Sequence, residues 1–181
     1  MDRRSIYFGK WNCKPIKWLE IQNIGNVSLF ISNKGICRMS FHTKNEGITW
    51  YGSDLRKWLN DTFYNNAFSE EEKQYIIRTI YTADEKPTWQ TWDYLDYYFD
   101  NGDVSLFDAD DYISLLSANE AKRFLNREER KIEGSWWLRS PGSHPQSAAH
   151  VGCGGSVMRR GHNIRHNIIV RPIMILKNIF E

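Results

Sequence analysis

The sequence predicts one domain of mixed α/β (α+β) structure, with several short strands and a few helices. Runs rich in β-branched and aromatic residues open and close the chain, and amphipathic helical spacing behind capping residues lies between them. A chain of 181 residues is long enough to bury roughly 70% of its unfolded surface. We therefore expect a single, independently folding domain over residues 1–181.

The first quarter of the chain predicts strands, because short β-rich runs alternate there with turn residues. This part is also basic, since residues 1–44 hold eight Lys and Arg against two acids. An opening strand should be followed by a hairpin and one more strand. The expected strands are Ser5–Trp11, Ile16–Gln22, Val27–Ser32 and Ile36–Phe41.

Helical signals follow. Ser53 is a good N-cap for an amphipathic helix with apolar residues at Leu55, Trp58, Leu59 and Phe63. Capping boxes of the S-x-x-E type begin two more helices. The first should run from Ser69 to about Thr79 with Tyr75, Ile76 and Ile80 inward, and the second from Ser117 to Leu125, followed by a charged helix end or linker over 126–131.

Residues 81–111 form an aromatic and acidic insert, which fits either a helical insert or a long packed loop. Its rings could bind a sugar or a base, although rings that pin an insert to the body of a domain are the more common case. A short strand, Tyr112–Leu116, should follow.

The C-terminal region, 134–176, predicts two buried strands around a polar segment. Ser135–Ser140 is aromatic and apolar and stops at Pro141-Gly142, and Ile168–Leu176 reads as a core strand in which Pro172 requires an edge position or a bulge. Arg139 and Arg171 lie inside these apolar runs. A buried guanidinium must be paired, so both should bond carboxylates or backbone carbonyls.

Residues 143–167, named the 143–167 segment below, differ from the rest of the chain in composition. The segment has no Asp, Glu, Lys, Trp, Tyr or Phe, yet it holds four of the five histidines, one cysteine and three arginines. Small apolar residues recur among its polar ones, which is typical of strands with one face on a core and one in solvent. The candidate ligand-binding residues are Ser143, His144, Pro145, His150, Gly152, Cys153, Met158, Arg159, Arg160, His162, Asn163, Arg165 and His166.

Composition excludes several classes of function. The net charge of +2 lacks the basic excess that is typical of nucleic-acid-binding proteins. No apolar run approaches the length of a membrane span. The start of the chain lacks the apolar core of a signal peptide, so we expect a soluble, unsecreted protein. Three cysteines without a C-x-x-C pair argue against a disulfide scaffold and favour a reducing compartment.

Enzymatic chemistry in the 143–167 segment is weakly supported. The spacing of His162 and His166 suits zinc on a helix, but the residues between them form a poor helix and neighbouring arginines repel a cation. Cys153 has no orienting acid in the segment, and the glycines around it lack the lysine of a phosphate loop. We expect no catalytic residue, no metal and no cofactor.

Several motifs together resemble a large bacterial and phage family of C-type lectin-like domains. They include W-W-L-R-S-P-G at 136–142, A-A-x-V at 148–151, G-S-V at 155–157 and V-R-P at 170–172, with upstream pieces such as Y-F-G-K at 7–10 and I-T-W at 48–50 in the usual order. The resemblance implies a fold in which the first and last strands pair, two helices flank them, and a small antiparallel sheet near the C-terminus carries the ligand face.

Within that fold the chain is most similar to the variable proteins of diversity-generating retroelements. In such proteins a W-W strand and a terminal V-R-P strand stay fixed while adenine-directed mutagenesis changes the positions between them. Randomised adenines in Asn codons cannot give Lys, Glu, Gln, Met or Trp, and within the 143–167 segment only Gln146 and Met158 fall outside the accessible set. An ordinary glycine- and serine-rich binding loop would share much of this bias.

The resemblance therefore implies a hypervariable binding face for receptor recognition at a phage or bacterial surface. Its basic, acid-free composition suggests an acidic protein or cell-surface target. The E-P-N, Q-P-D and W-N-D motifs of calcium-dependent lectins do not occur, and the cysteine pair of formylglycine-generating enzymes is reduced to Cys153. The alternatives are a fixed lectin-like module, a structural module of an oligomeric surface or virion assembly, and a metal-dependent enzyme that uses the same histidines and cysteine.

Overall fold

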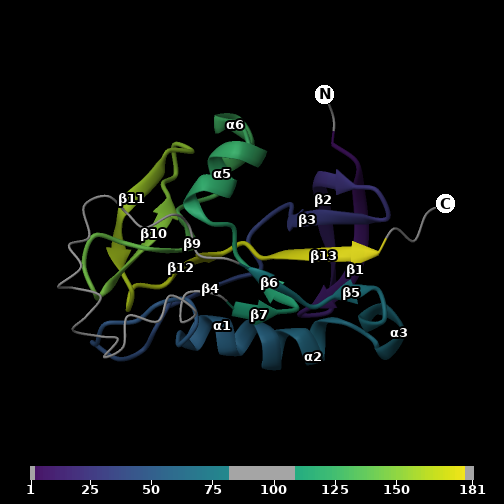
Figure 1. The fold of residues 1–181 in the computed structure, drawn as a ribbon, viewed down its shortest axis with the longest axis horizontal. Helices are drawn as coiled ribbons and strands as arrows, with labels where there is room; N and C mark the ends of the chain where they lie inside the picture. The colour runs from purple at the N-terminus through teal and green to yellow at the C-terminus, as the bar shows by residue number, and fades with distance from the viewer. Residues whose placement is uncertain (1–2, 82–108, 178–181) are drawn as a thin grey trace.

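The computed structural model describes residues 3–81 and 109–177. Within these ranges the chain has a mixed α+β fold with many strands and a few short helices, which confirms the predicted fold class. Most of the predicted aromatic and acidic insert lies outside the described residues. Figure 1 places the strands of residues 5–32 toward one end of the molecule and the hairpin of β10 (Ser147–Val151) and β11 (Val157–Asn163) at the other.

The first sheet joins the two ends of the chain. Its order is β1-β2-β3-β13-β5, and β8 also pairs with β13. The strands are β1 (Ser5–Trp11), β2 (Lys14–Ile24), β3 (Val27–Ser32), β5 (Ile76–Ile77), β8 (Ile113–Ser114) and β13 (Ile173–Lys177).

The expected pairing of the first and last strands is wrong, because β13 pairs with β3 and not with β1. Two tight turns explain this. Asn12, Cys13 and Gly25 adopt positive φ, so β1, β2 and β3 fold back on one another as a meander and leave the far edge of β3 for β13.

The second sheet carries the C-terminal region. Its order is β11-β10-β9-β12-β4, and a separate pair joins β6 to β7. The strands are β4 (Cys37–Met39), β6 (Thr79–Tyr81), β7 (Ala109–Asp111), β9 (Trp136–Pro141), β10 (Ser147–Val151), β11 (Val157–Asn163) and β12 (Ile168–Val170).

The predicted single strand Ile168–Leu176 is instead two strands in two different sheets. Arg171 and Pro172 connect β12 to β13, and the backbone ladder breaks there because proline has no N–H to donate. The carbonyl of Pro172 still accepts from Ser32 N at 3.0 Å. The connection therefore joins the two sheets.

The helices follow their capping signals. α1 (Asp54–Trp58), a π-helical stretch (Leu59–Phe63) and α2 (Tyr64–Ala67) succeed one another without a break behind the N-cap Ser53, as expected. α5 (Ala118–Phe124) also confirms its prediction, and α6 (Arg127–Arg130) is a short helix of its own with Asn126 as its N-cap.

The helix expected over 69–79 is too long. Ser69 does form the predicted capping box, but α3 (Glu70–Lys73) ends after one turn and the chain continues as β5 and β6. Ile76 is buried as expected, whereas Tyr75 is 38% and Ile80 is 64% exposed. The β-branched residues that follow Tyr75 favour strands, and β13 and β7 offer edges to pair with.

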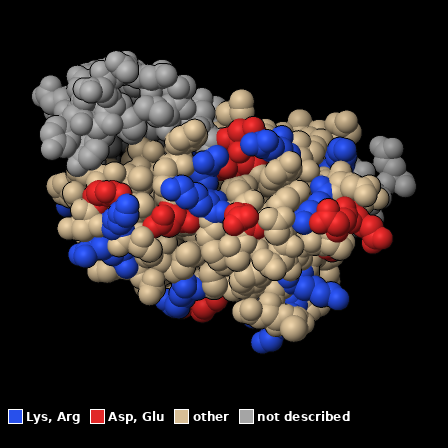
Figure 2. Space-filling model, turned by 90° about the horizontal axis from the view of Figure 1, so that it is seen from below, with Lys and Arg blue, Asp and Glu red and all other residues tan. Residues whose placement is uncertain are grey.

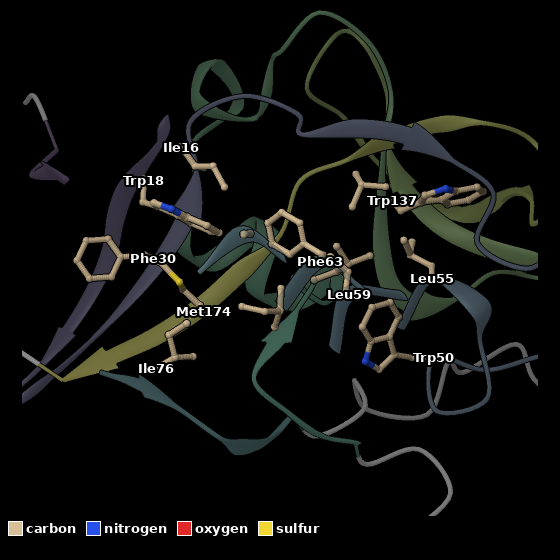
Figure 3. Packing of buried hydrophobic residues seen from close by; sticks show 14 of the residues in the cluster. Ile16, Trp18, Phe30, Trp50, Leu55, Leu59, Phe63, Ile76, Trp137 and Met174 are labelled. Carbon is tan, nitrogen blue, oxygen red and sulfur yellow. The ribbon is translucent and has the colours of Figure 1, made fainter. Parts of the chain in front are cut away.

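Two apolar layers cover opposite faces of the sheets. Trp137 and Met174 pack with Leu55, Leu59 and Phe63 of the α1–α2 helix, as Figure 3 shows, whereas Trp136 and Ile173 pack with α5. Neighbouring residues of a strand thus enter different cores, as the alternation of side chains requires. In Figure 1 the α1–α2 helix and the α5–α6 pair lie on opposite sides of the sheets.

Candidate recognition face

The strand before the 143–167 segment is fixed on both faces. Trp136 and Trp137 are fully buried, and their indole N–H groups donate to Arg130 O and Met39 O, each at 2.9 Å. The hydroxyl of Ser140 accepts from Ala118 N at 2.8 Å. Because each polar group has a backbone partner, β9 holds the second sheet to α5, α6 and β4.

Both buried arginines are paired, as predicted. Arg139 bonds the carboxylate of Glu120, which also caps α5, and donates to Leu115 O at 2.8 Å. Arg171 is 1% exposed and donates to Ser32 O and Glu129 O, each at 3.0 Å. Burial lowers the pKa of Arg171 to about 10, which still leaves it charged at neutral pH. These residues stabilise the fold.

The 143–167 segment divides into a buried set and an exposed set. Ala148, Ala149, Val151 and Ile164 are at most 1% exposed, and they anchor β10 and the turn after β11 to the two cores. Met158 is 45% exposed. The other exposed residues of the segment are His144, Cys153, Gly154, Ser156, Arg160, Arg165, His166 and Asn167.

Three of the four histidines of the segment form a cluster beside Trp137, named the histidine cluster. The His162 ring lies 5.3 Å from that of His150 and 4.5 Å from that of His166, and its distance to the Trp137 ring is 6.2 Å. His144 is exposed in the turn that precedes β10. The cluster spans β10, β11 and the turn that follows.

The hydrogen bonds of the cluster fix the tautomer of His162. Its Nδ1 accepts from Asn163 N at 3.0 Å and lies 3.0 Å from His166 Nδ1. Because the Asn163 N–H donates to it, His162 Nδ1 is the unprotonated nitrogen, and the ring is neutral with its proton on Nε2. Burial, together with the nearby His166, lowers the pKa of His162 in agreement with this.

His150 is the inner member of the cluster. Burial, with His162 as the second cause, lowers the pKa of its imidazole to about 4. Its Nδ1 atom is buried and has no hydrogen-bond partner among the described residues. His150 is therefore neutral at pH 7 and contributes ring surface rather than charge.

The opposite end of the hairpin is held by α6. Arg127 Nε donates to Gly154 O at 3.1 Å, and Arg130 Nε donates to Gly155 O at 2.8 Å. The exposed Cys153 and its neighbour Gly152 lie in this turn. They are thus separated by the length of β11 from His162 and His166 but lie next to His150 in the chain, and the turn is less free than its glycines suggest.

The structure therefore does not place all thirteen candidate residues on one surface. Arg159 turns toward α5, where its guanidinium bonds the side-chain oxygen of Asn119. Met158 pairs across the strands with His150 and so lies on the side of the histidine cluster. Ser143 is half-buried, and both its N–H and its hydroxyl donate to Arg160 O.

The loop at residues 42–48 also contacts the 143–167 segment, and the sequence patterns did not predict this contact. His42 N donates to Ile164 O at 3.1 Å, and Ile48 N donates to Pro145 O at 3.3 Å. The His42 ring is buried between two carboxylates, 3.1 Å from both Glu46 and Asp54. The only signal in the sequence was the His42-to-Glu46 spacing, which does not reveal a contact with the distant 143–167 segment.

The comparisons with known proteins give one match. Residues 25–178 match the family described as a domain of unknown function, DUF6273. The chain belongs to this family. No curated protein and no solved structure matches it.

The DUF6273 match contains β9, the 143–167 segment and the connection at Arg171, but it leaves out β1 and β2. Within residues 3–81 and 109–177, no group of three or more His, Cys, Asp or Glu is arranged to hold a metal ion. No helix in the same ranges has the length and apolar character needed to cross a membrane.

Proposed function

We propose that this DUF6273 domain is a non-enzymatic C-type lectin-like recognition protein. Its binding face is the outer side of β11 with the turns at both of its ends, and a retroelement diversifies the exposed positions of that face. The observation that carries the proposal is the division of the 143–167 segment: four small apolar residues anchor it, while the exposed side chains between them support no core.

The chemistry of the exposed side chains suits recognition. Planar groups supply hydrogen-bond donors: the guanidinium groups of Arg160 and Arg165 and the imidazole of His166. The flexible side chain of Met158 supplies an apolar contact. No acid occurs in the segment, so an acidic partner surface would complement it.

The codon pattern fits the exposed set, as it also fits the buried one. Every exposed residue of the segment except Met158 belongs to the amino acids that an Asn codon can yield when its adenines are randomised. Diversification that respects the fold would change these positions and spare Ala148, Ala149, Val151 and Ile164.

The gene itself provides the test. We would sequence the codons of 143–167 in many copies from one population, together with the flanking DNA. We expect substitutions at the exposed positions, an unchanged buried set, and a near-copy repeat beside a reverse transcriptase. An invariant segment without such a repeat would contradict diversification and leave a fixed recognition module.

Binding to a cell-surface target is tested separately. Fluorescently labelled protein is mixed with intact cells from the population that supplied the gene copies, and the stained cells are counted by flow cytometry. A variant with Ser at Met158, Arg160, Arg165 and His166 should lose cell staining and keep its melting temperature. Its matched control carries Gln at the exposed Lys57 and Lys122. Equal staining by both variants would contradict the assigned face.

A further inference from the structure

A groove opens between the β1–β2 hairpin and the connection from β3 to β4. Its volume of about 660 Å³ falls within the range of small-molecule sites. Gly35 forms part of its wall, and a Cβ there would lie only 2.1 Å from Ile169 Cγ2. The connection therefore packs directly on β12, and a side chain at this position would push the wall away from it.

The groove is positively charged. Lys14, Lys17 and Lys34 line it, and no carboxylate does so among the described residues. None of the three forms an ion pair within the described ranges, whereas Lys73 and Lys131 are paired with Glu70 and Glu128. The face in Figure 2 likewise shows acidic and basic side chains side by side. Three like charges around one hollow attract an anion.

An exposed aromatic ring adjoins these charges. Tyr7 is 71% exposed and pairs across the strands with Lys17, so both side chains lie on one face of the hairpin. Trp11 is held in place by edge contacts with the rings of Trp58 and Phe63, at 5.4 and 5.2 Å. Both rings thus line the groove together with the ammonium groups.

Two amides complete the lining. Asn12 and Asn33 each carry a donor and an acceptor, which is the combination that a sugar hydroxyl can satisfy in both directions. The faces of aromatic rings carry partial negative charge and pack against the C–H groups of a sugar ring. Rings, amides and unpaired ammonium groups in one groove are complementary to a sugar that bears an anionic group.

We propose that this groove binds an anionic carbohydrate, a chain of sugar rings that carries carboxylate, sulfate or phosphate groups. The site is separate from the recognition face, because β4 and β11 are the opposite edges of the second sheet. Four strand spacings put them about 19 Å apart. The groove also depends on β1 and the start of β2, which lie outside the DUF6273 match.

The test is a fluorescence polarisation titration of the full chain with labelled hexasaccharides. Oligogalacturonate supplies carboxylates, a heparin hexasaccharide supplies sulfates, a phosphorylated mannan hexasaccharide supplies phosphates, and maltohexaose is the neutral control. Oligodeoxythymidine and a polyglutamate peptide are anions without the required sugar chemistry. We expect binding of at least one acidic hexasaccharide, and which one binds identifies the anionic group.

Variants test the residues. Lys14→Gln with Lys17→Gln should weaken binding about tenfold, since it removes two of the three positive charges that line the groove. Tyr7→Ala should weaken it severalfold, and all three side chains are exposed or half-buried, so folding should be kept. The control is Lys57→Gln with Lys122→Gln, which should bind like the unaltered chain.

Three titration results with the unaltered chain would overturn the proposal. They are binding of no acidic hexasaccharide below millimolar concentration, equal binding of maltohexaose, and equal or tighter binding of oligodeoxythymidine or polyglutamate. Unchanged affinity in Tyr7→Ala would also overturn it, because the anion alone would then account for binding.

Discussion

The strand at 136–141 and the 143–167 segment adjoin in the chain and in the second sheet, but they are held in opposite ways. In β9 five of the six residues are buried, and its indole and guanidinium groups all have partners. In the 143–167 segment the buried residues are mainly apolar, and most long polar side chains are exposed or half-buried, with Arg159 turned toward α5. A sheet can therefore fix a backbone through one set of residues and leave another set free to change.

The largest effect should come from the fixed strand. Trp137→Ala would remove a fully buried indole that packs on Phe41 and bonds Met39 O, and should lower the free energy of unfolding by about 3–5 kcal/mol. Met158→Ala, its control on the exposed side of the hairpin, should change it by less than about 0.5 kcal/mol. Urea unfolding followed by tryptophan fluorescence measures both. Similar losses in the two variants would remove the distinction between the regions.

The second prediction tests a fixed point inside the 143–167 segment. Gly161 has φ of +85°, and a Cβ there would lie 2.7 Å from Ala148 O. It sits where the four steps of β11 from Met158 to His162 span the two steps from His150 to Ala148 on β10. Gly161→Ala should therefore cost about 1–3 kcal/mol of stability.

Gly152→Ala is the matched control, since its nearest neighbouring atoms would be 3.8 Å from the new Cβ. Thermal unfolding of the two variants should separate them by several degrees. If Gly161→Ala is as stable as Gly152→Ala, the bulge adapts and more of the segment is changeable than the structure indicates. In either case, Gly161 should be constant among natural copies if the bulge is needed for the fold.

Local sequence patterns were sufficient to predict part of the fold. The capping residues Ser53, Ser69 and Ser117 begin helices where expected, and the aromatic run at 136–140 is a buried strand. Helix ends were less predictable. After Lys73 the β-branched residues pair with strands far away in sequence, and no local pattern reveals those partners.

The candidate site shows the same limit. Composition singled out the 143–167 segment, but alternation alone could not place Arg159, because the bulge in β11 shifts the register beside it. His42 escaped notice because its role depends on a contact with Ile164. The two-sheet arrangement of Ile168–Leu176 depends on Pro172, which was recognised as a break without an indication that the chain changes sheets there.

The smallest expected effect concerns acid and the histidine cluster. Burial lowers the pKa of His150 to about 4, whereas an unfolded histidine titrates near 6.5. Between these values the unfolded chain binds more protons than the folded one, so stability is fully present above about pH 6.5 and falls as the pH drops toward 4. His162, whose pKa is also lowered by burial and by His166, contributes in the same direction. The fixed strand has no group of this kind.

Melting temperatures measured at pH 7.5, 6.5 and 5.5 test this difference. His150→Gln removes the titrating ring and should flatten the decline in melting temperature between pH 6.5 and 5.5 by a few degrees. The control is His144→Gln, an exposed histidine of the same segment, which should keep the original slope. If His150→Gln declines as steeply as the unaltered chain, the acid sensitivity arises elsewhere. The His150 side chain would then belong to the fixed region, like the residues of β9, and the boundary between the two regions would lie within β10.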